Sequence, residues 1–261
     1  MPDLRDMKRR GEKIAALTAY DYLFAKLVDG AGVDVVLVGD SLGQVVLGLD
    51  TTLAVTLDDM IHHARGVRRG VERALLVVDL PFLTYQVSRE DALRNAGRVL
   101  QETGAAAVKL EGGSPEMAET VRALVRAGIP VMGHLGFTPQ SVNVIGVRVQ
   151  GRDDGARERL LEEARRLEDA GCFSLVLELV PGALAEEISR SISIPTIGIG
   201  AGAGCDGQVL VLHDMLGLNA DFKPKFLRRF AEVGQLASEG VGGFVRAVKG
   251  GEYPAAEHTF E

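Results

Sequence analysis

The sequence predicts a single (β/α)8 TIM barrel, on three observations. The chain has 261 residues, which is the usual length of one such domain. It contains eight short apolar runs that do not alternate with polar residues, as is typical of strands buried on both faces. Helical patterns separate most of these runs. The runs are residues 14–20, 35–40, 74–81, 106–113, 130–136, 174–180, 195–200 and 209–214.

The predicted helices have recognisable starts and ends. Thr56 precedes apolar residues at helical spacing that end at Gly70, and Ser88 opens a second helix. Ser114 is a cap that Pro115 follows at the first helical position. Strands that alternate with helices fit a barrel or a doubly wound open sheet, and the number of strands favours the barrel.

No linker, low-complexity segment or shift in composition divides the chain. We therefore expect one barrel domain over residues 1–261, with a C-terminal helical extension at about 223–261. Its long helix is predicted at residues 223–249, ahead of a polar tail.

Composition excludes several classes of partner. The net charge is −7 and there is no basic tract, which argues against nucleic acid. No apolar run approaches the roughly 20 residues that cross a bilayer, so we expect no membrane span. The beginning of the chain lacks the apolar segment of a signal peptide. Cys172 and Cys205 match no metal or redox spacing, so we expect a reducing, cytoplasmic location.

Polar side chains follow several predicted strands, at the end where the active site of a (β/α)8 barrel lies. They are Tyr20, Asp21, Asp40, Ser41, Asp79, Lys109, Glu111, His134, Glu178 and Asp214. Asp40, Asp79 and Glu111 follow three consecutive strands, and adjacent strands lie about 4.8 Å apart. Three carboxylates at such short separations need a compensating positive charge. Oxygen ligands without a Cys/His cluster indicate Mg²⁺ or Mn²⁺.

Each of these residues also has a structural interpretation. Asp79 precedes Leu80–Pro81 and could serve as a turn residue. Lys109 lies two positions before Glu111, so both side chains point the same way and can form a salt bridge. His134 fits a hydrogen-bonded core histidine equally well. Three acids on successive strand ends are harder to explain in this way.

Long motifs in a fixed order resemble the ketopantoate hydroxymethyltransferase family, from about Ala15 to the end of the chain. They are TAYDYLFAKL, VLVGDSLG, DLPF, VKLEGG, GHLGFTPQSVN, VQGR, LELVP, IGIGAG, CDGQVLVLHDMLG, PKF and the tail YPAAEHTF. The segment NVIGVRVQGR, residues 143–152, departs from the family's usual glycine-aromatic version.

The resemblance implies a Mg²⁺-dependent enzyme of pantothenate and coenzyme A biosynthesis. Such an enzyme transfers a one-carbon unit from 5,10-methylenetetrahydrofolate to 3-methyl-2-oxobutanoate, and forms 2-dehydropantoate through a metal-stabilised enolate. It also implies a homo-oligomer, a decamer built as a pentamer of dimers.

Matched motif by motif, the resemblance implies the following roles. The metal ligands are Asp40, Asp79 and Glu111; the keto-acid site comprises Asp40, Ser41, Asp79 and Lys109; and the catalytic base is Glu178. His134 and Tyr20 are possible additional active-site residues.

Two other functions fit parts of the pattern. One is a different metal-enolate barrel enzyme of the pyruvate or phosphoenolpyruvate type, which would share the acidic corner without the folate chemistry. The other is a catalytically silent barrel that serves as an assembly protein. The ordered motifs and the presence of every motif acid favour the transferase.

Overall fold

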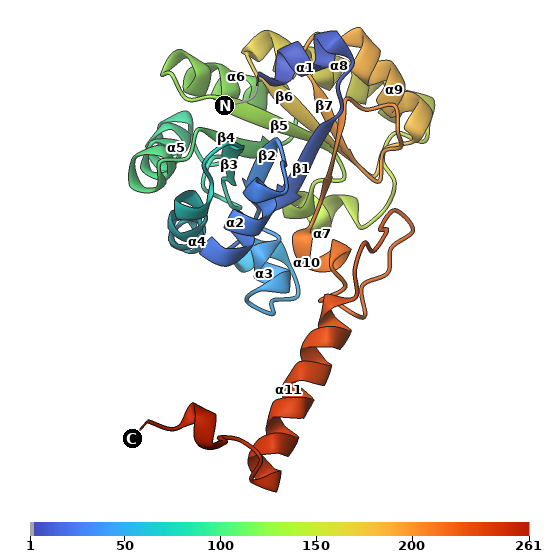
Figure 1. Cartoon of the computed structure of the whole chain (residues 1–261). Helices are drawn as coiled ribbons and strands as arrows, with labels where there is room; N and C mark the ends of the chain where they lie inside the picture. The colour runs from blue at the N-terminus through green and yellow to red at the C-terminus, as the bar shows by residue number, and fades with distance from the viewer. Residues whose placement is uncertain (1–2, 261) are drawn as a thin grey trace. The chain divides into compact units, whose positions relative to one another are not determined.

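The computed structural model, which describes residues 3–260, confirms the predicted closed barrel (Figure 1). Eight parallel strands pair in chain order, and the eighth pairs with the first. Because the strands are parallel, all their carboxyl ends open at one mouth. The strands are β1 (Ile14–Thr18), β2 (Val35–Val38), β3 (Leu75–Asp79), β4 (Ala107–Glu111), β5 (Val131–Gly136), β6 (Ser174–Glu178), β7 (Thr196–Ile199) and β8 (Gly207–Leu210).

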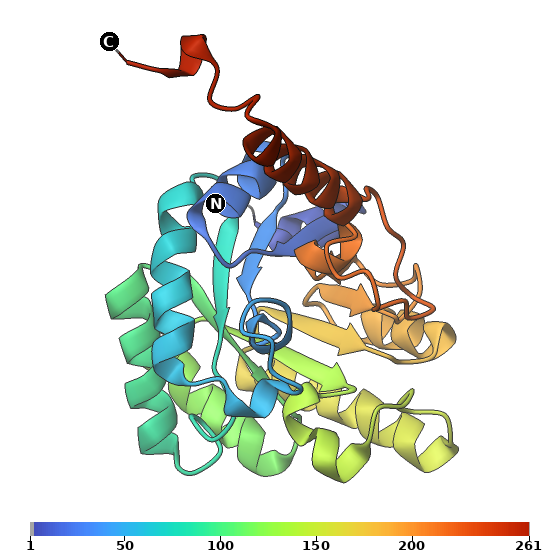
Figure 2. The ribbon, with the colours of Figure 1, turned by 90° about the horizontal axis from the view of Figure 1, so that it is seen from below.

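Helices surround the strands, as the view in Figure 2 shows. The helices of the barrel are α1 (Leu4–Arg10), α2 (Tyr22–Gly30), α3 (Leu42–Val45), α4 (Leu57–Gly70), α5 (Arg89–Thr103), α6 (Pro115–Arg126), α7 (Val142–Ile145), α8 (Asp154–Ala170) and α9 (Gly182–Ser191), with short 3-10 turns at Thr52–Ala54 and Pro139–Ser141. Within residues 3–260, no helix combines the length and apolarity needed to cross a bilayer.

The predicted caps are confirmed. The Thr56 hydroxyl accepts the N–H of Asp59, whose carboxylate accepts the N–H of Thr56 in return, so a complete capping box begins α4. The hydroxyls of Ser88 and Ser114 accept N–H groups three residues on, at 3.1 and 3.2 Å. These bonds satisfy donors that a helix start leaves unpaired.

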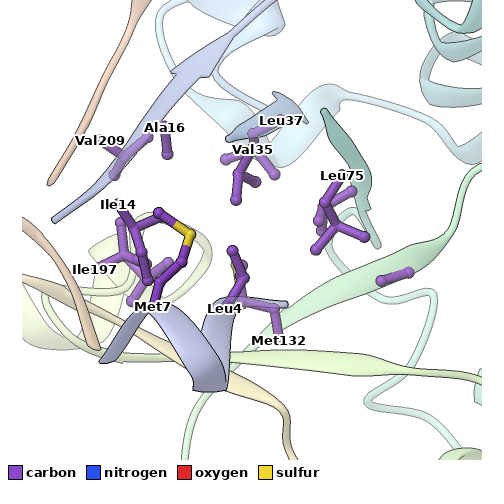
Figure 3. Packing of buried hydrophobic residues seen from close by; sticks show 13 residues of the cluster. Leu4, Met7, Ile14, Ala16, Val35, Leu37, Leu75, Met132, Ile197 and Val209 are labelled. Carbon is purple, nitrogen blue, oxygen red and sulfur yellow. The ribbon is translucent and has the colours of Figure 1, made fainter. Parts of the chain in front are cut away.

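The apolar core fills the amino-terminal half of the barrel, and α1 closes that end. Leu4 and Met7 of α1 are buried and point towards the strand side chains (Figure 3). The strand residues of this cluster are Ile14, Ala16, Val35, Leu37, Leu75, Val77, Ala107, Met132, Val176, Ile197 and Val209. The amino-terminal end of the barrel is therefore closed by apolar packing, and only its carboxyl end is available to a polar site.

The chain separates into two compact units, with the barrel ending at Val211 and a second unit beginning at Leu212. The strand predicted at residues 209–214 is wrong at its end. Strand β8 stops at Leu210 because Leu212–Met215 forms the helix α10. Asp214 therefore lies in a helix and not at a strand end, and its carboxylate accepts the side-chain amide of Asn219 at 3.2 Å.

The long C-terminal helix, α11, covers Val233–Gly250, so the prediction of 223–249 is wrong at its start. The backbone N–H groups of Phe230 and Val233 donate to Met215 O and Leu216 O, both at 2.8 Å. These bonds hold the preceding segment in loops against α10, and they prevent an earlier helix start. A 3-10 turn at Ala256–His258 follows α11.

Asp29 ties the end of α2 to the entry of β3. Its buried carboxylate accepts the backbone N–H groups of Glu72, Arg73 and Ala74 at 2.8–3.3 Å. Burial raises the pKa of Asp29, but these three donors outweigh burial and hold the pKa below its ordinary value. A carboxyl with a lowered pKa stabilises the fold above its ordinary pKa, and this contribution is lost as the pH falls through the folded value.

Replacing Asp29 with Asn should therefore lower the free energy of unfolding by about 1.5–3 kcal/mol near neutral pH, the range for hydrogen bonds to charged groups. The difference from the unmodified chain should shrink in acid. Urea denaturation at several pH values measures it, with the exposed Asp50→Asn as control. A deficit that does not change with pH would contradict a role for the ionised carboxylate.

Candidate active site

Alternate residues of each strand point into the barrel, and this alternation places polar side chains at the mouth. On β3, Val77 belongs to the apolar core, and Asp79, two residues on, points the same way. On β4, Ala107 belongs to the core, and Lys109 and Glu111 follow it on the same face. The same continuation on β5 and β6 leads from Met132 to His134 and from Val176 to Glu178. Polar side chains therefore form the layer next to the hydrophobic core, on the side of the carboxyl ends of the strands.

Six side chains form a group that we call the mouth cluster: Asp40, Asp79, Lys109, Glu111, His134 and Glu178. Lys109 Nζ lies 3.1 Å from Asp79 Oδ1, so its ion pair is with Asp79. The other carboxylate oxygen of Asp79 accepts the backbone N–H of Asp40 at 3.1 Å. This bond joins the turn after β2 to the end of β3.

His134 lies at the centre of the cluster. Its Nδ1 is 3.3 Å from Lys109 Nζ and 3.5 Å from Glu111 Oε1, and its Nε2 is 3.2 Å from Glu178 Oε2. Burial and the Lys109 ammonium lower the pKa of His134, but the two neighbouring carboxylates outweigh them and raise it to about 9. The imidazole of His134 thus lies between Glu111 and Glu178 and contacts both carboxylates.

Electrostatic crowding in the cluster appears in the pKa of Asp40. Burial, followed by repulsion from Asp79 and Glu111, raises this pKa to about 8, although Lys109 and Gln140 act in the opposite direction. Burial also raises the pKa of Asp79, despite the neighbouring Lys109. Like charges held together in a dry site produce such shifts.

Ser41 and Tyr20 lie beside Asp40 and form a pair. The Tyr20 hydroxyl and Ser41 Oγ are 2.8 Å apart, and Tyr20 is almost completely buried. Burial is the main cause that raises the pKa of Tyr20 above its ordinary value. The phenol therefore keeps its proton and fixes the position of the Ser41 hydroxyl.

Glu178 is the most accessible member of the cluster, with 17% of its side chain exposed. Its backbone position depends on Gly136, where a Cβ would lie 2.2 Å from Glu178 O and where φ is +93°. The next residue, Leu179, has a φ of 48°, which is uncommon for a non-glycine residue. The backbone N–H of Leu179 donates to Ile199 O, and its carbonyl accepts the N–H of Gln150. These two hydrogen bonds hold Leu179 in this backbone conformation.

Gln140 and Tyr85 also belong to this site, although the sequence interpretation assigned them no role. Gln140 donates its backbone N–H to Glu111 Oε2 at 3.0 Å and its side-chain amide to Asp40 Oδ2 at 2.9 Å. Tyr85 OH donates to Gln140 Oε1 at 2.7 Å. The only signal in the sequence was the position of Gln140 within the motif GHLGFTPQSVN.

The donor set fits a divalent cation with few protein ligands. With every group ionised, the four carboxylates of the mouth cluster face two cations, which leaves two negative charges uncompensated. Glu111 Oε1 is buried and makes no hydrogen bond of good geometry. Among residues 3–260, no group of three or more His, Cys, Asp or Glu side chains is arranged to hold a metal ion by itself. Mg²⁺ needs only one or two carboxylates, since water and substrate oxygens complete its shell.

Together, the fold and the site define a (β/α)8-barrel enzyme with a buried, charged centre at the carboxyl ends of its strands. A family model described as ketopantoate hydroxymethyltransferase matches residues 1–256. The chain belongs to the ketopantoate hydroxymethyltransferase family, and it is therefore a transferase.

Curated relatives agree with this assignment. A protein of Clostridium novyi (strain NT) is 54% identical over 255 residues, which cover 97% of this chain and 92% of the relative. A protein of Nitratidesulfovibrio vulgaris (strain DP4) is 56% identical over 259 residues, or 99% and 84% of the two chains. Both are named 3-methyl-2-oxobutanoate hydroxymethyltransferase.

Solved structures show the same fold at low identity. A phosphonopyruvate hydrolase in complex with oxalate and Mg²⁺ has a TM-score of 0.64 at 12% identity, with 98% of this chain and 92% of that chain covered. A 2,3-dimethylmalate lyase has a TM-score of 0.59 at 16% identity, with 100% and 93% covered. These likenesses concern the fold alone, so they do not favour the pyruvate-type alternative.

Replacing Asp40 with Asn should stabilise the metal-free protein. A carboxyl whose pKa is raised in the fold destabilises it above the ordinary pKa, and this cost grows until the folded pKa of about 8 is passed. The melting temperature of the variant, measured with EDTA, should therefore exceed that of the unmodified chain by more at about pH 8 than at about pH 5. The exposed Asp169→Asn is the control. If the unmodified chain instead melted at a higher temperature than Asp40→Asn at about pH 8, the result would contradict the electrostatic crowding of Asp40.

Proposed function

We propose that this chain transfers a one-carbon unit from 5,10-methylenetetrahydrofolate to 3-methyl-2-oxobutanoate in a Mg²⁺-dependent reaction that forms 2-dehydropantoate. The observation that carries the proposal is the mouth cluster, in which three carboxylates from consecutive strand ends lie beside a lysine and a separate, more accessible glutamate. The names of relatives at 54–56% identity support the choice of substrate.

Asp40, Asp79 and Glu111 are the residues that would hold Mg²⁺, directly or through water. The excess of carboxylates over cations in the cluster, which contributes to the raised pKa of Asp40, supports this assignment, as does Glu111 Oε1, which is buried without a hydrogen bond of good geometry. When bound there, Mg²⁺ would act as a Lewis acid on the oxygens of the keto acid.

Lys109 and Ser41 would bind the keto acid beside Asp40 and Asp79. The raised pKa of Lys109, to which all three acidic neighbours contribute against the effect of burial, keeps its ammonium charged. A buried point cation compensates part of the charge of a substrate carboxylate. The Ser41 hydroxyl, whose orientation Tyr20 fixes, offers a hydrogen bond to the same group.

Glu178 would remove the proton from C3 of the keto acid. C3 is a tertiary carbon next to the ketone, and its proton is weakly acidic, so a positioned base is needed. The contact of His134 Nε2 with Glu178 Oε2 constrains one carboxylate oxygen. The second oxygen can then face the substrate from the accessible side of the mouth.

Loss of this proton to Glu178 would give the enolate of the keto acid. Water would break both carbon–nitrogen bonds of the methylene bridge, so that the two nitrogens gain its protons, tetrahydrofolate leaves, and a one-carbon unit at the oxidation level of formaldehyde remains. C3 of the enolate would then form the carbon–carbon bond with this unit, and the new hydroxyl oxygen would take the proton back from Glu178. The reaction belongs to pantothenate and coenzyme A biosynthesis, so small molecules are the expected partners.

We also propose a cytoplasmic location and assembly with further copies of the chain, a decamer as the family resemblance implies. The unpaired thiols of Cys172 and Cys205 suit a reducing compartment. Leu236, Phe244 and Val248 recur along α11, and no residue of this helix is buried. An apolar face of this kind needs a covering surface, and light scattering would measure the assembly.

Glu178→Gln tests the proposed base. The amide is nearly isosteric, so Mg²⁺ and keto acid should bind with affinities close to those of the unmodified enzyme. Because the amide cannot accept the C3 proton, exchange of this proton in D₂O, followed by NMR, should fall by at least about 100-fold.

The exposed Glu90→Gln is the matched control and should exchange at the normal rate. If Glu178→Gln exchanged the C3 proton at the normal rate at saturating keto acid, another residue would be the base, and His134 would be the next candidate. If the unmodified chain exchanged the carbon-bound protons of pyruvate but not the C3 proton of 3-methyl-2-oxobutanoate, the result would favour the pyruvate-type enzyme. If it exchanged the protons of neither compound, the result would favour the silent barrel.

A further inference from the structure

Gln140 makes hydrogen bonds to both Asp40 and Glu111, two of the proposed metal ligands. It lies in the 3-10 turn after β5, and only 6% of it is exposed. Its side-chain amide donates to Asp40 Oδ2 at 2.9 Å and to Leu80 O at 3.0 Å. Its Oε1 accepts from Tyr85 OH at 2.7 Å and from Gln86 Nε2 at 3.1 Å. The hydrogen-bonding capacity of the amide is thus fully used.

Its partners fix which way this amide points. Leu80 O and the Asp40 carboxylate are acceptors, so the NH₂ group must face them. Tyr85 OH accepts the backbone N–H of Glu111 at 3.1 Å, which leaves its own proton for Gln140 Oε1. A flipped amide would turn its oxygen towards two acceptors. The network therefore has one favourable direction, from Glu111 N–H through Tyr85 and Gln140 to Asp40.

This network acts on one oxygen of each carboxylate. Gln140 bonds Asp40 through Oδ2 and, with its backbone N–H, bonds Glu111 through Oε2. The second oxygen of Glu111, Oε1, is buried without a hydrogen bond of good geometry. One residue thus orients carboxylates from two different strand ends, while the other oxygen of Glu111 faces His134 Nδ1 at 3.5 Å.

We propose that Gln140 is a positioning residue for the divalent cation, and that Tyr85 fixes the orientation of its amide. The inference rests on the proposed function, since it assumes that Asp40 and Glu111 serve the metal. Groups that orient metal ligands in this way commonly change metal affinity by about 10–100-fold when they are replaced.

Gln140→Met tests the proposal, because methionine has a similar length but no amide. With Mn²⁺ as the probe, the dissociation constant from electron paramagnetic resonance titration should rise by about 10–100-fold. Turnover lost at limiting Mn²⁺ should be recovered at saturating Mn²⁺, whereas a purely structural defect would not respond to the metal. The exposed Gln101→Met is the matched control and should bind Mn²⁺ normally.

Tyr85→Phe provides a second test should Gln140→Met fail to fold, because it removes a single oxygen. It should raise the Mn²⁺ dissociation constant in the same direction, while the exposed Tyr22→Phe leaves it unchanged. In the double variant with Gln140→Met, the two effects should not add, because Tyr85 acts through Gln140.

The outcomes separate this inference from the proposed function. A folded Gln140→Met with an Mn²⁺ dissociation constant within about twofold of the unmodified chain would overturn the inference alone. If Gln140→Met does not fold, an unchanged constant in Tyr85→Phe would do the same. Absence of Mn²⁺ binding by the unmodified chain would instead contradict the proposed function on which the inference rests.

Discussion

The structure of the site depends on four carboxylates that share a nearly dry barrel mouth with one lysine and one histidine. Desolvation alone would make such a group unfavourable. Lys109 and His134 compensate part of the charge through contacts of 3.1–3.5 Å with their acidic neighbours. The remaining imbalance, visible in the raised pKa of Asp40, is the physical reason to expect a divalent cation and an anionic substrate in place of an empty structural cluster.

Much of this arrangement could be predicted from the sequence because a barrel strand imposes two simple rules. Continuous apolar runs identified the eight strands, and the parallel topology required their carboxyl ends to meet at one mouth. Asp79, Lys109 and Glu111 could then be located without any knowledge of contacts. Pairing could not be derived in this way: Lys109 contacts Asp79 on the neighbouring strand and forms no ion pair with Glu111, two residues away.

The parts that the sequence did not predict depend on contacts between residues distant along the chain. Gln140 reaches Asp40 across 100 positions, and no local pattern distinguishes a glutamine that orients a carboxylate from one on the surface. The late start of α11 has a similar cause, because Phe230 and Val233 use their N–H groups outside a helix. Sequence periodicity reports burial and local propensity, but not hydrogen bonds between separate loops.

The central claim is that the mouth cluster holds one divalent cation against the keto acid. A crystal structure with Mg²⁺ and 3-methyl-2-oxobutanoate tests this most directly. The account predicts a single cation beside Asp40, with its direct oxygen ligands at about 2.0–2.1 Å, some of them from the keto acid. It also predicts that Asp79 and Glu111 face this cation directly or through its water molecules. A cation or keto acid bound away from Asp40, with the mouth cluster unchanged and its carboxylates turned elsewhere, would contradict the account.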